Sequence, residues 1–86
     1  VSEAVARAMA QGALERSSAD IALGVTGFAG PAGDGCEEGL VHFALARRGG
    51  ATRHRVEHFG SAGRGPVRIK ALFAMLEMLE ESLGEG

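Results

Sequence analysis

The sequence predicts a single small α/β domain, and three observations support that prediction. A chain of 86 residues holds one hydrophobic core and leaves too little for a second. The short continuous apolar run at residues 21–25 (IALGV) is typical of a strand buried on both faces, as in α/β sheets. Segments with helical periodicity lie before this run and after a predicted hairpin. The expected order is therefore helix, strand, hairpin, helix.

Composition narrows the classes of function. Hydrophobic residues make up 45% and charged residues 23% of the chain, with a mean hydropathy of +0.06, which is typical of a packed globular protein. Nine Lys and Arg against eleven Asp and Glu leave a net charge of −2, so we expect no nucleic-acid partner. No apolar run approaches the roughly 20 residues that span a bilayer, and no secretory leader is recognisable. Because Cys36 is the single cysteine, no internal disulfide forms, and we expect a cytoplasmic protein without membrane contact.

The first helix is expected to begin at Ser2, a good N-cap, with Glu3 in its first turn, and to end near Glu15. Its predicted apolar stripe recurs at every fourth residue: Val1, Val5, Met9 and Ala13.

A hairpin is predicted from strands at residues 40–46 and 51–59, joined by a two-residue turn at Gly49 and Gly50. This turn pairs Leu45 with His54 and places His42 opposite Glu57, on the other side of the sheet from the remaining histidines. A tetrahedral metal site needs three or four converging ligands. We therefore expect no metal, unless the register shifts by one residue.

The last helix is predicted with Pro66 in its first turn and a stop at Gly84. Its apolar residues keep a 3/4 spacing: Ile69, Leu72, Phe73, Leu76, Leu79 and Leu83. Arg64, Arg68 and Lys70 lie near its start, where the helix dipole favours anions over cations. Either these cations hold a phosphate together with the helix N–H groups, or they form a solvated basic turn.

The loop at residues 26–31 (TGFAGP) follows the carboxyl end of the buried strand, which is where α/β sheets place ligands. Its glycine spacing matches neither the dinucleotide fingerprint nor a P-loop. A ligand loop and an ordinary strand-exit turn both remain open. Cys36 lies farther along, next to acidic residues and with no cation beside it to lower its thiol pKa, so it is a poor nucleophile candidate.

Four segments in this order, VSEAVARAMAQGAL, ADIALGVTGFAGP, GLVHFALA and FGSAGRGPVRIKAL, resemble the C-terminal half of the CinA C-terminal domain family, the nicotinamide-nucleotide amidohydrolases. The resemblance covers nearly the whole chain, so residues 1–86 are expected to be the C-terminal half of one such domain. The implied fold is a three-layer α/β/α sandwich with a mixed sheet. The strand and hairpin are its last three strands, and the middle one runs antiparallel to its neighbours.

The resemblance implies hydrolysis of nicotinamide mononucleotide to nicotinate mononucleotide and ammonia, without a cofactor or metal. It places the nucleophilic serine in an AESCTGG motif of the other half, followed by a tyrosine and a lysine, and this chain contains neither that motif nor any tyrosine. Carried over by matching motif are Thr26 as the catalytic residue and, for substrate binding, Gly27, Phe28, Ala29, Gly30 and Arg64.

The implied partners are a nicotinamide nucleotide, the missing half of the domain or another chain, and further copies in a homo-oligomer. Two departures from the family pattern lie near the implied site: residues 59–64 read FGSAGR instead of FPGDR, and residues 34–39 lack the usual Lys-Pro. The competing hypothesis is a non-catalytic nucleotide- or phosphate-binding or dimerisation module of a competence/damage-inducible CinA-like protein. A ligand-free scaffold is a third.

Overall fold

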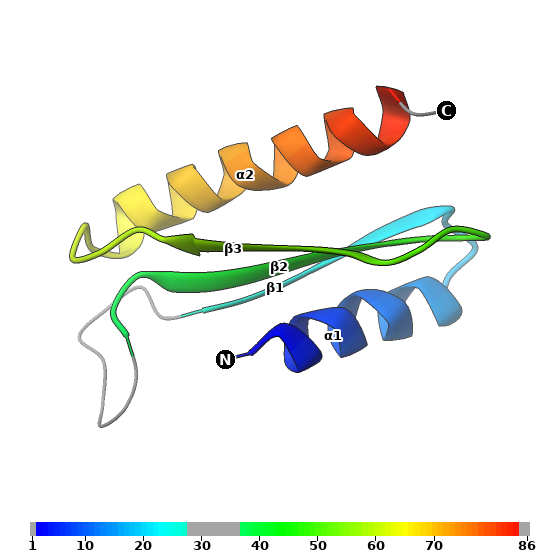
Figure 1. The fold of residues 1–86 in the computed structure, drawn as a ribbon, viewed down its shortest axis with the longest axis horizontal. Coiled ribbons are helices and arrows are strands. Elements are labelled where there is room, and N and C mark those ends of the chain that lie inside the picture. The colour runs from blue at the N-terminus through cyan, green and yellow to red at the C-terminus, as the bar shows by residue number, and fades with distance from the viewer. Residues whose placement is uncertain (1, 28–36, 85–86) are drawn as a thin grey trace.

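The computed structural model describes residues 2–27 and 37–84 and has the predicted order of elements. Helix α1 (Glu3–Glu15) leads into strand β1 (Ile21–Gly27), then β2 (Leu40–Arg47), β3 (Arg53–His58) and helix α2 (Arg64–Gly84). The three strands form one antiparallel sheet in the order β1-β2-β3. The two helices cover opposite faces of the sheet, giving three α/β/α layers (Figure 1). The fold class is thus confirmed, and a mixed sheet would need strands beyond these three.

Helix α1 begins where its sequence signals place it but packs through a different face. The Ser2 hydroxyl accepts a hydrogen bond from the Val5 N–H at 3.2 Å, as an N-cap does. Ala6 and Ala10 are fully buried, whereas Val5 and Met9 of the predicted stripe are 45% and 44% exposed. The prediction of that stripe was wrong because the helix lies too close to the sheet for large side chains.

Gly24 of β1 makes this close approach possible. A Cβ atom there would lie 2.5 Å from the carbonyl oxygen of Ala6 and 2.8 Å from the backbone nitrogen of Ala10. The buried cluster on this side consists of small residues: Ala6, Ala10, Ala44 and Ala46. Helix and sheet therefore meet almost backbone to backbone.

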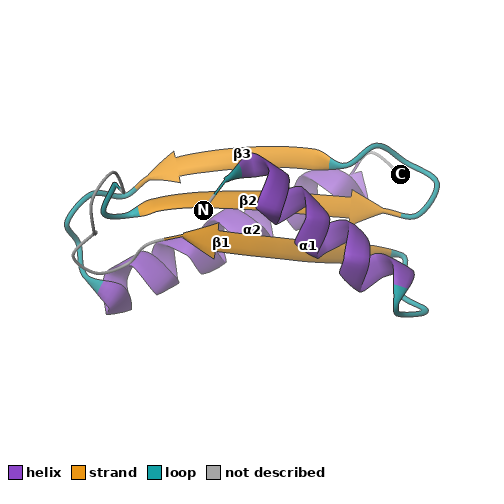
Figure 2. Ribbon diagram, turned by 90° about the horizontal axis from the view of Figure 1, so that it is seen from below, coloured by secondary structure: helices purple, strands orange, loops and turns teal. Residues whose placement is uncertain are grey.

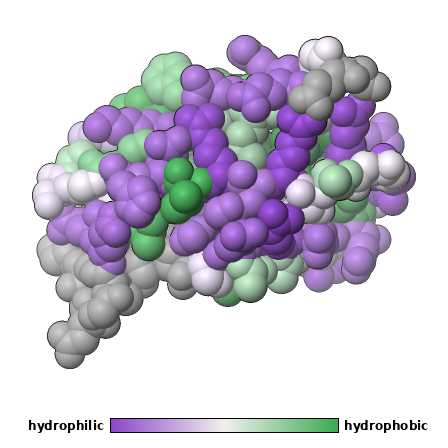
Figure 3. Space-filling view, in the orientation of Figure 1, coloured by the Kyte–Doolittle hydropathy of each residue, from purple (hydrophilic) through white to green (hydrophobic). Residues whose placement is uncertain are grey.

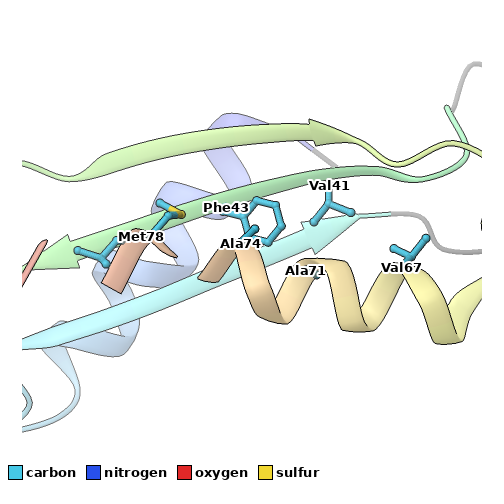
Figure 4. Close-up of a cluster of buried hydrophobic side chains, with 7 residues drawn as sticks. Val41, Phe43, Val67, Ala71, Ala74 and Met78 are labelled. Atoms are coloured by element: carbon cyan, nitrogen blue, oxygen red, sulfur yellow. The ribbon is translucent and has the colours of Figure 1, made fainter. Parts of the chain in front are cut away.

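The opposite face of the sheet carries the larger core. Val41, Phe43 and Leu45 of β2 belong to the cluster that packs against one side of α2, and Figure 4 shows Val41 and Phe43 in it. That side of α2 presents mostly small residues: Val67, Ala71, Ala74, Met78 and Ser82. The predicted stripe points away from the sheet: Ile69, Leu72, Phe73, Leu76 and Leu83 are all exposed, and Leu79 is half-buried. We call these five exposed residues the apolar stripe of α2.

Two arginines at the end of the hairpin hold the layers together. Arg47 donates to the carbonyl oxygen of Ser82 at 2.8 Å and so ties β2 to the end of α2. Arg48 donates to the carbonyl oxygens of Leu14, in the last turn of α1, and of Ser17 and Ala19, in the connection that follows, at 3.1, 3.2 and 2.6 Å. Both residues are therefore structural.

The hairpin register differs by one residue from the predicted one. Leu45 pairs with Arg53, Ala44 with His54 and His42 with Val56. The turn is longer than two residues: the Gly50 N–H donates to the Arg47 carbonyl oxygen at 3.0 Å, and Gly49 has φ +77°. One extra residue in the turn moves every β3 side chain to the other face of the sheet.

Candidate functional site

The predicted site residues lie at one end of the sheet. Gly27 pairs with Val41 and His58 pairs with Leu40, so the carboxyl ends of β1 and β3 meet the start of β2. Helix α2 begins at this same end, as Figure 1 shows. Thr26, Gly27 and Arg64 therefore share one end of the fold.

Thr26 belongs to β1, which runs two residues farther than predicted. Side chains alternate along a strand, and Gly24 faces α1, so the half-buried Thr26 faces the same side. Gly27 is exposed, and a Cβ atom there would lie 2.6 Å from the carbonyl oxygen of Leu40. Close packing of β1 on β2 thus accounts for this glycine without a ligand. The predicted binding residues Phe28, Ala29 and Gly30, like Cys36, lie outside the described residues.

Arg64 is the first residue of α2 and is exposed. The Val67 N–H donates to the Gly63 carbonyl oxygen at 3.1 Å, and the first turn of α2 contains no acidic residue. Helix α2, which begins with Arg64, and the Thr26 side chain lie on opposite faces of the sheet. A ligand that touches both Arg64 and Thr26 must therefore extend around the end of the sheet.

The changed register unites two histidines that sequence reasoning had separated. His42 and His54 lie on the α1 face, and Nδ1 of His42 lies 3.0 Å from Nε2 of His54. Across the other neighbouring strand, the residue paired with His42 is Thr26. A histidine pair therefore lies beside the predicted catalytic threonine. Predicting this histidine pair would require the exact length of the hairpin turn, and the sequence Arg-Arg-Gly-Gly does not reveal that length.

Charges surround this pair. Glu3 of α1 places Oε1 3.6 Å from Nδ1 of His54, while its Oε2 accepts from Nε of Arg7 at 2.8 Å. The hydrogen bond from Arg7, and next the charge of His54, lower the pKa of Glu3. Burial, and next the charge of His54, lower the pKa of His42. His58 is largely exposed and lies 2.6 Å from Glu37.

An open groove of about 500 Å³ lies elsewhere, between β3 and the later turns of α2. It is lined by Arg53, His54, Arg55, Met78 and Glu81. In the wall of this groove, Arg55 forms ion pairs with Glu57 at 2.6 Å and with Glu77 at 2.9 Å. The hydrogen bond to Glu57, and also the one to Glu77, raise the pKa of the Arg55 guanidinium above its usual value. The groove does not reach the end of the sheet where Thr26 lies. Within residues 2–27 and 37–84, no three His, Cys, Asp or Glu side chains are placed to hold a metal ion, and neither helix can cross a membrane.

Comparison with known proteins gives one consistent picture. The model of the CinA C-terminal domain matches residues 1–83. A CinA-like protein of Akkermansia muciniphila is 58% identical over 82 residues, which are 90% of this chain and 20% of that protein. The crystal structure of the competence/damage inducible protein CihA from Agrobacterium tumefaciens is 42% identical and superposes with a TM-score of 0.88 over 94% of this chain and 50% of that one.

Protein YdeJ of Escherichia coli is 38% identical over 82 residues, which are 93% of this chain and 47% of YdeJ. The chain thus spans about a fifth of the Akkermansia relative and about half of YdeJ and of the solved Agrobacterium chain. The match to the family model along nearly the whole sequence, and the agreement in fold, show that the chain belongs to the CinA C-terminal domain family.

Proposed function

We propose that this chain supplies the Thr26 and Arg64 part of an amidohydrolase that converts nicotinamide mononucleotide to nicotinate mononucleotide and ammonia. The observation that carries the proposal is the convergence of the carboxyl ends of β1 and β3 with the start of α2. In α/β proteins such an end is the preferred place for a ligand. The Arg64 side chain, together with the backbone N–H groups of Arg64 and Gly65 at the start of α2, suits a phosphate.

In this proposal the nucleophile is a serine from polypeptide corresponding to the unmatched half of the solved relatives. Its oxygen attacks the carboxamide carbon, the serine hydroxyl proton passes to the amide nitrogen, and the C–N bond breaks, so that ammonia leaves. Water then hydrolyses the resulting ester and restores the serine. Thr26 and nearby backbone N–H groups stabilise the oxyanion, a contribution typically worth ~10²–10³ in turnover for one donor.

Two surfaces support the presence of such polypeptide against this chain. Five large side chains form the apolar stripe of α2, and Phe73 is 62% exposed. The two edges of the sheet also differ. β3 is polar and carries the pairs of Arg55, and the face in Figure 3 is mostly hydrophilic, whereas β1 (IALGVTG) is apolar. Charged edges resist pairing and apolar edges invite it. We therefore place the additional strands at β1 and additional helix over the stripe.

A chimera tests the proposed function. This chain replaces the matching half of the Agrobacterium protein, and ammonia release from nicotinamide mononucleotide is measured. Arg64→Ala should lower kcat/KM by about one to two decades, because a charge-assisted hydrogen bond contributes ~1.5–3 kcal/mol. Arg68→Ala, one turn farther along, is the matched control and should have little effect.

Nicotinamide riboside, which lacks the phosphate, separates a phosphate contact from a general electrostatic effect. With Arg64 present, removing the phosphate should reduce kcat/KM, and in the Arg64→Ala variant it should make little further difference. Equal, modest losses for both arginine variants on both substrates would refute the site. Binding of the nucleotide without ammonia release would favour the non-catalytic module.

A further inference from the structure

His42 and His54 are joined by an in-line hydrogen bond. The centroids of the two rings lie 5.2 Å apart, the distance from Nδ1 of His42 to Nε2 of His54 is 3.0 Å, and the ring planes differ by 28°. The centroid distance exceeds the nitrogen distance by about two ring radii. Both nitrogens therefore lie near the line that joins the two centroids. That is the geometry of N–H···N, in which one imidazole donates and the other accepts. Two metal ligands would instead direct their lone pairs at a common point off that line.

The carboxylate of Glu3 favours one of the two possible directions of this hydrogen bond. Its Oε1 lies 3.6 Å from Nδ1 of His54, so the proton of neutral His54 is favoured on Nδ1 and its Nε2 is left as the acceptor. With His54 as the acceptor, His42 donates from Nδ1, and this direction of the hydrogen bond leaves Nε2 of His42 without a proton. The hydrogen bond from Arg7 lowers the pKa of the Glu3 carboxyl, and burial lowers the pKa of His42, so the two shifts favour a charged Glu3 and an uncharged His42.

The unprotonated nitrogen faces the Thr26 side of the sheet. The two nitrogens of an imidazole point to nearly opposite sides of the ring. Because Nδ1 of His42 points at β3, Nε2 lies toward β1, where Thr26 is directly across from His42. Directly opposed residues have Cβ atoms about 4.5–5.5 Å apart. Helix α1 crosses the sheet diagonally and leaves the carboxyl end of β1 uncovered (Figure 2).

We infer that Glu3, His54 and His42 form a proton relay, and that Nε2 of His42 is the general base for the hydrolytic water. The inference rests on the proposed amidohydrolase. The water oxygen bonds to the ester carbon while its proton moves to Nε2, and the bond from carbon to the serine oxygen breaks. The same proton then passes to the serine oxygen, so His42 returns neutral. Glu3, through His54, stabilises the transient positive charge.

The first test measures tautomers by ¹⁵N NMR of the chimera labelled at histidine, with assignment from single substitutions. We expect the proton on Nδ1 of both His42 and His54 near neutral pH. Glu3→Gln should remove that preference at His54. A proton on Nε2 of His42, or tautomers indifferent to Glu3, would overturn the relay. The same spectra of the 86-residue chain provide an independent second measurement.

The second test is kinetic and distinguishes a base from a structural residue. Ammonia leaves before water attacks, so His42→Gln should retain a burst of one equivalent while steady-state turnover falls ~10²–10⁴-fold. His54→Gln should move the acidic limb of the pH profile. His58→Gln, on the same strand and face but exposed, is the control. Unchanged turnover in His42→Gln would refute the base. An inactive unsubstituted chimera would refute the proposed function and with it the base role, while the tautomers still decide the relay.

Discussion

Replacing Gly24 by alanine tests how closely α1 lies on the sheet. The new Cβ would lie 2.5 Å from the Ala6 carbonyl oxygen and 2.8 Å from the Ala10 nitrogen, where ordinary contact begins near 3.4 Å. Both neighbours are backbone, so α1 as a whole must withdraw by close to an ångström. Overpacking of this kind costs ~1–3 kcal/mol. In the chimera, about twice the length of this chain, each kcal/mol should lower Tm by roughly 2–4 °C.

Gly65→Ala is the matched control for Gly24→Ala. Gly65 lies in α2, and a Cβ atom there meets nothing within 4 Å. Because glycine is a poor helix former, this substitution should raise the stability by up to ~1 kcal/mol. Thermal unfolding followed by circular dichroism gives both values. If Gly24→Ala melts within a degree of the parent, or both variants shift in the same direction, the close packing of α1 on β1 is wrong.

Three further perturbations test other parts of the structure. Arg48→Ala should lower the free energy of unfolding by ~1–2 kcal/mol in denaturant titrations, because it leaves the carbonyl oxygens of Leu14, Ser17 and Ala19 without their charged donor; no loss relative to the exposed control Arg68→Ala would contradict this. The lowered pKa of His42 means that below pH ~6.5 the unfolded chain takes up the proton first, so stability should fall with falling pH until folded His42 is protonated too. His42→Gln should flatten that slope in melts across this range, and an unchanged slope would rule His42 out as its cause. The 86-residue chain alone should self-associate and bind an apolar dye through the apolar stripe of α2, whereas the chimera should bind less dye; a monomeric chain without dye binding at high concentration would contradict the exposed stripe.

The order of the elements was predictable because the residues that begin helices and form turns are easy to recognise in this sequence. The Ser2 cap gave the start of α1, and the loop residues around Gly49 gave the hairpin. The end of the sheet that carries Thr26 and Arg64 was predictable for a similar reason, since strand polarity alone places successive strand ends. The resemblance to the CinA C-terminal domain selected the same residues independently.

Register was not predictable because it depends on a single residue in the turn. Arg-Arg-Gly-Gly permits a tight two-residue turn, yet the turn closes from Gly50 to Arg47 and shifts β3 by one position. The shift brings His54 onto the face of His42 and Thr26 and removes Glu57 from it. The sequence predicts that His42 and His54 lie on opposite faces of the sheet, and this prediction is wrong. The two histidines lie on the same face and form a hydrogen bond with each other.

The inverted faces of both helices follow from one physical cause. Periodicity identifies the apolar side of a helix but not the surface that covers it. Here the sheet accepts small residues, because Gly24 and the alanines of β2 bring α1 close, and α2 also places alanines toward the strands. The large side chains of α2 are therefore left for a second contact. A helix with apolar residues on two sides is expected where polypeptide packs on both of them. The sequence pattern of α2 therefore reflects packing in a whole domain. Among the described residues, only the sheet packs on α2, and it covers the side with the small residues.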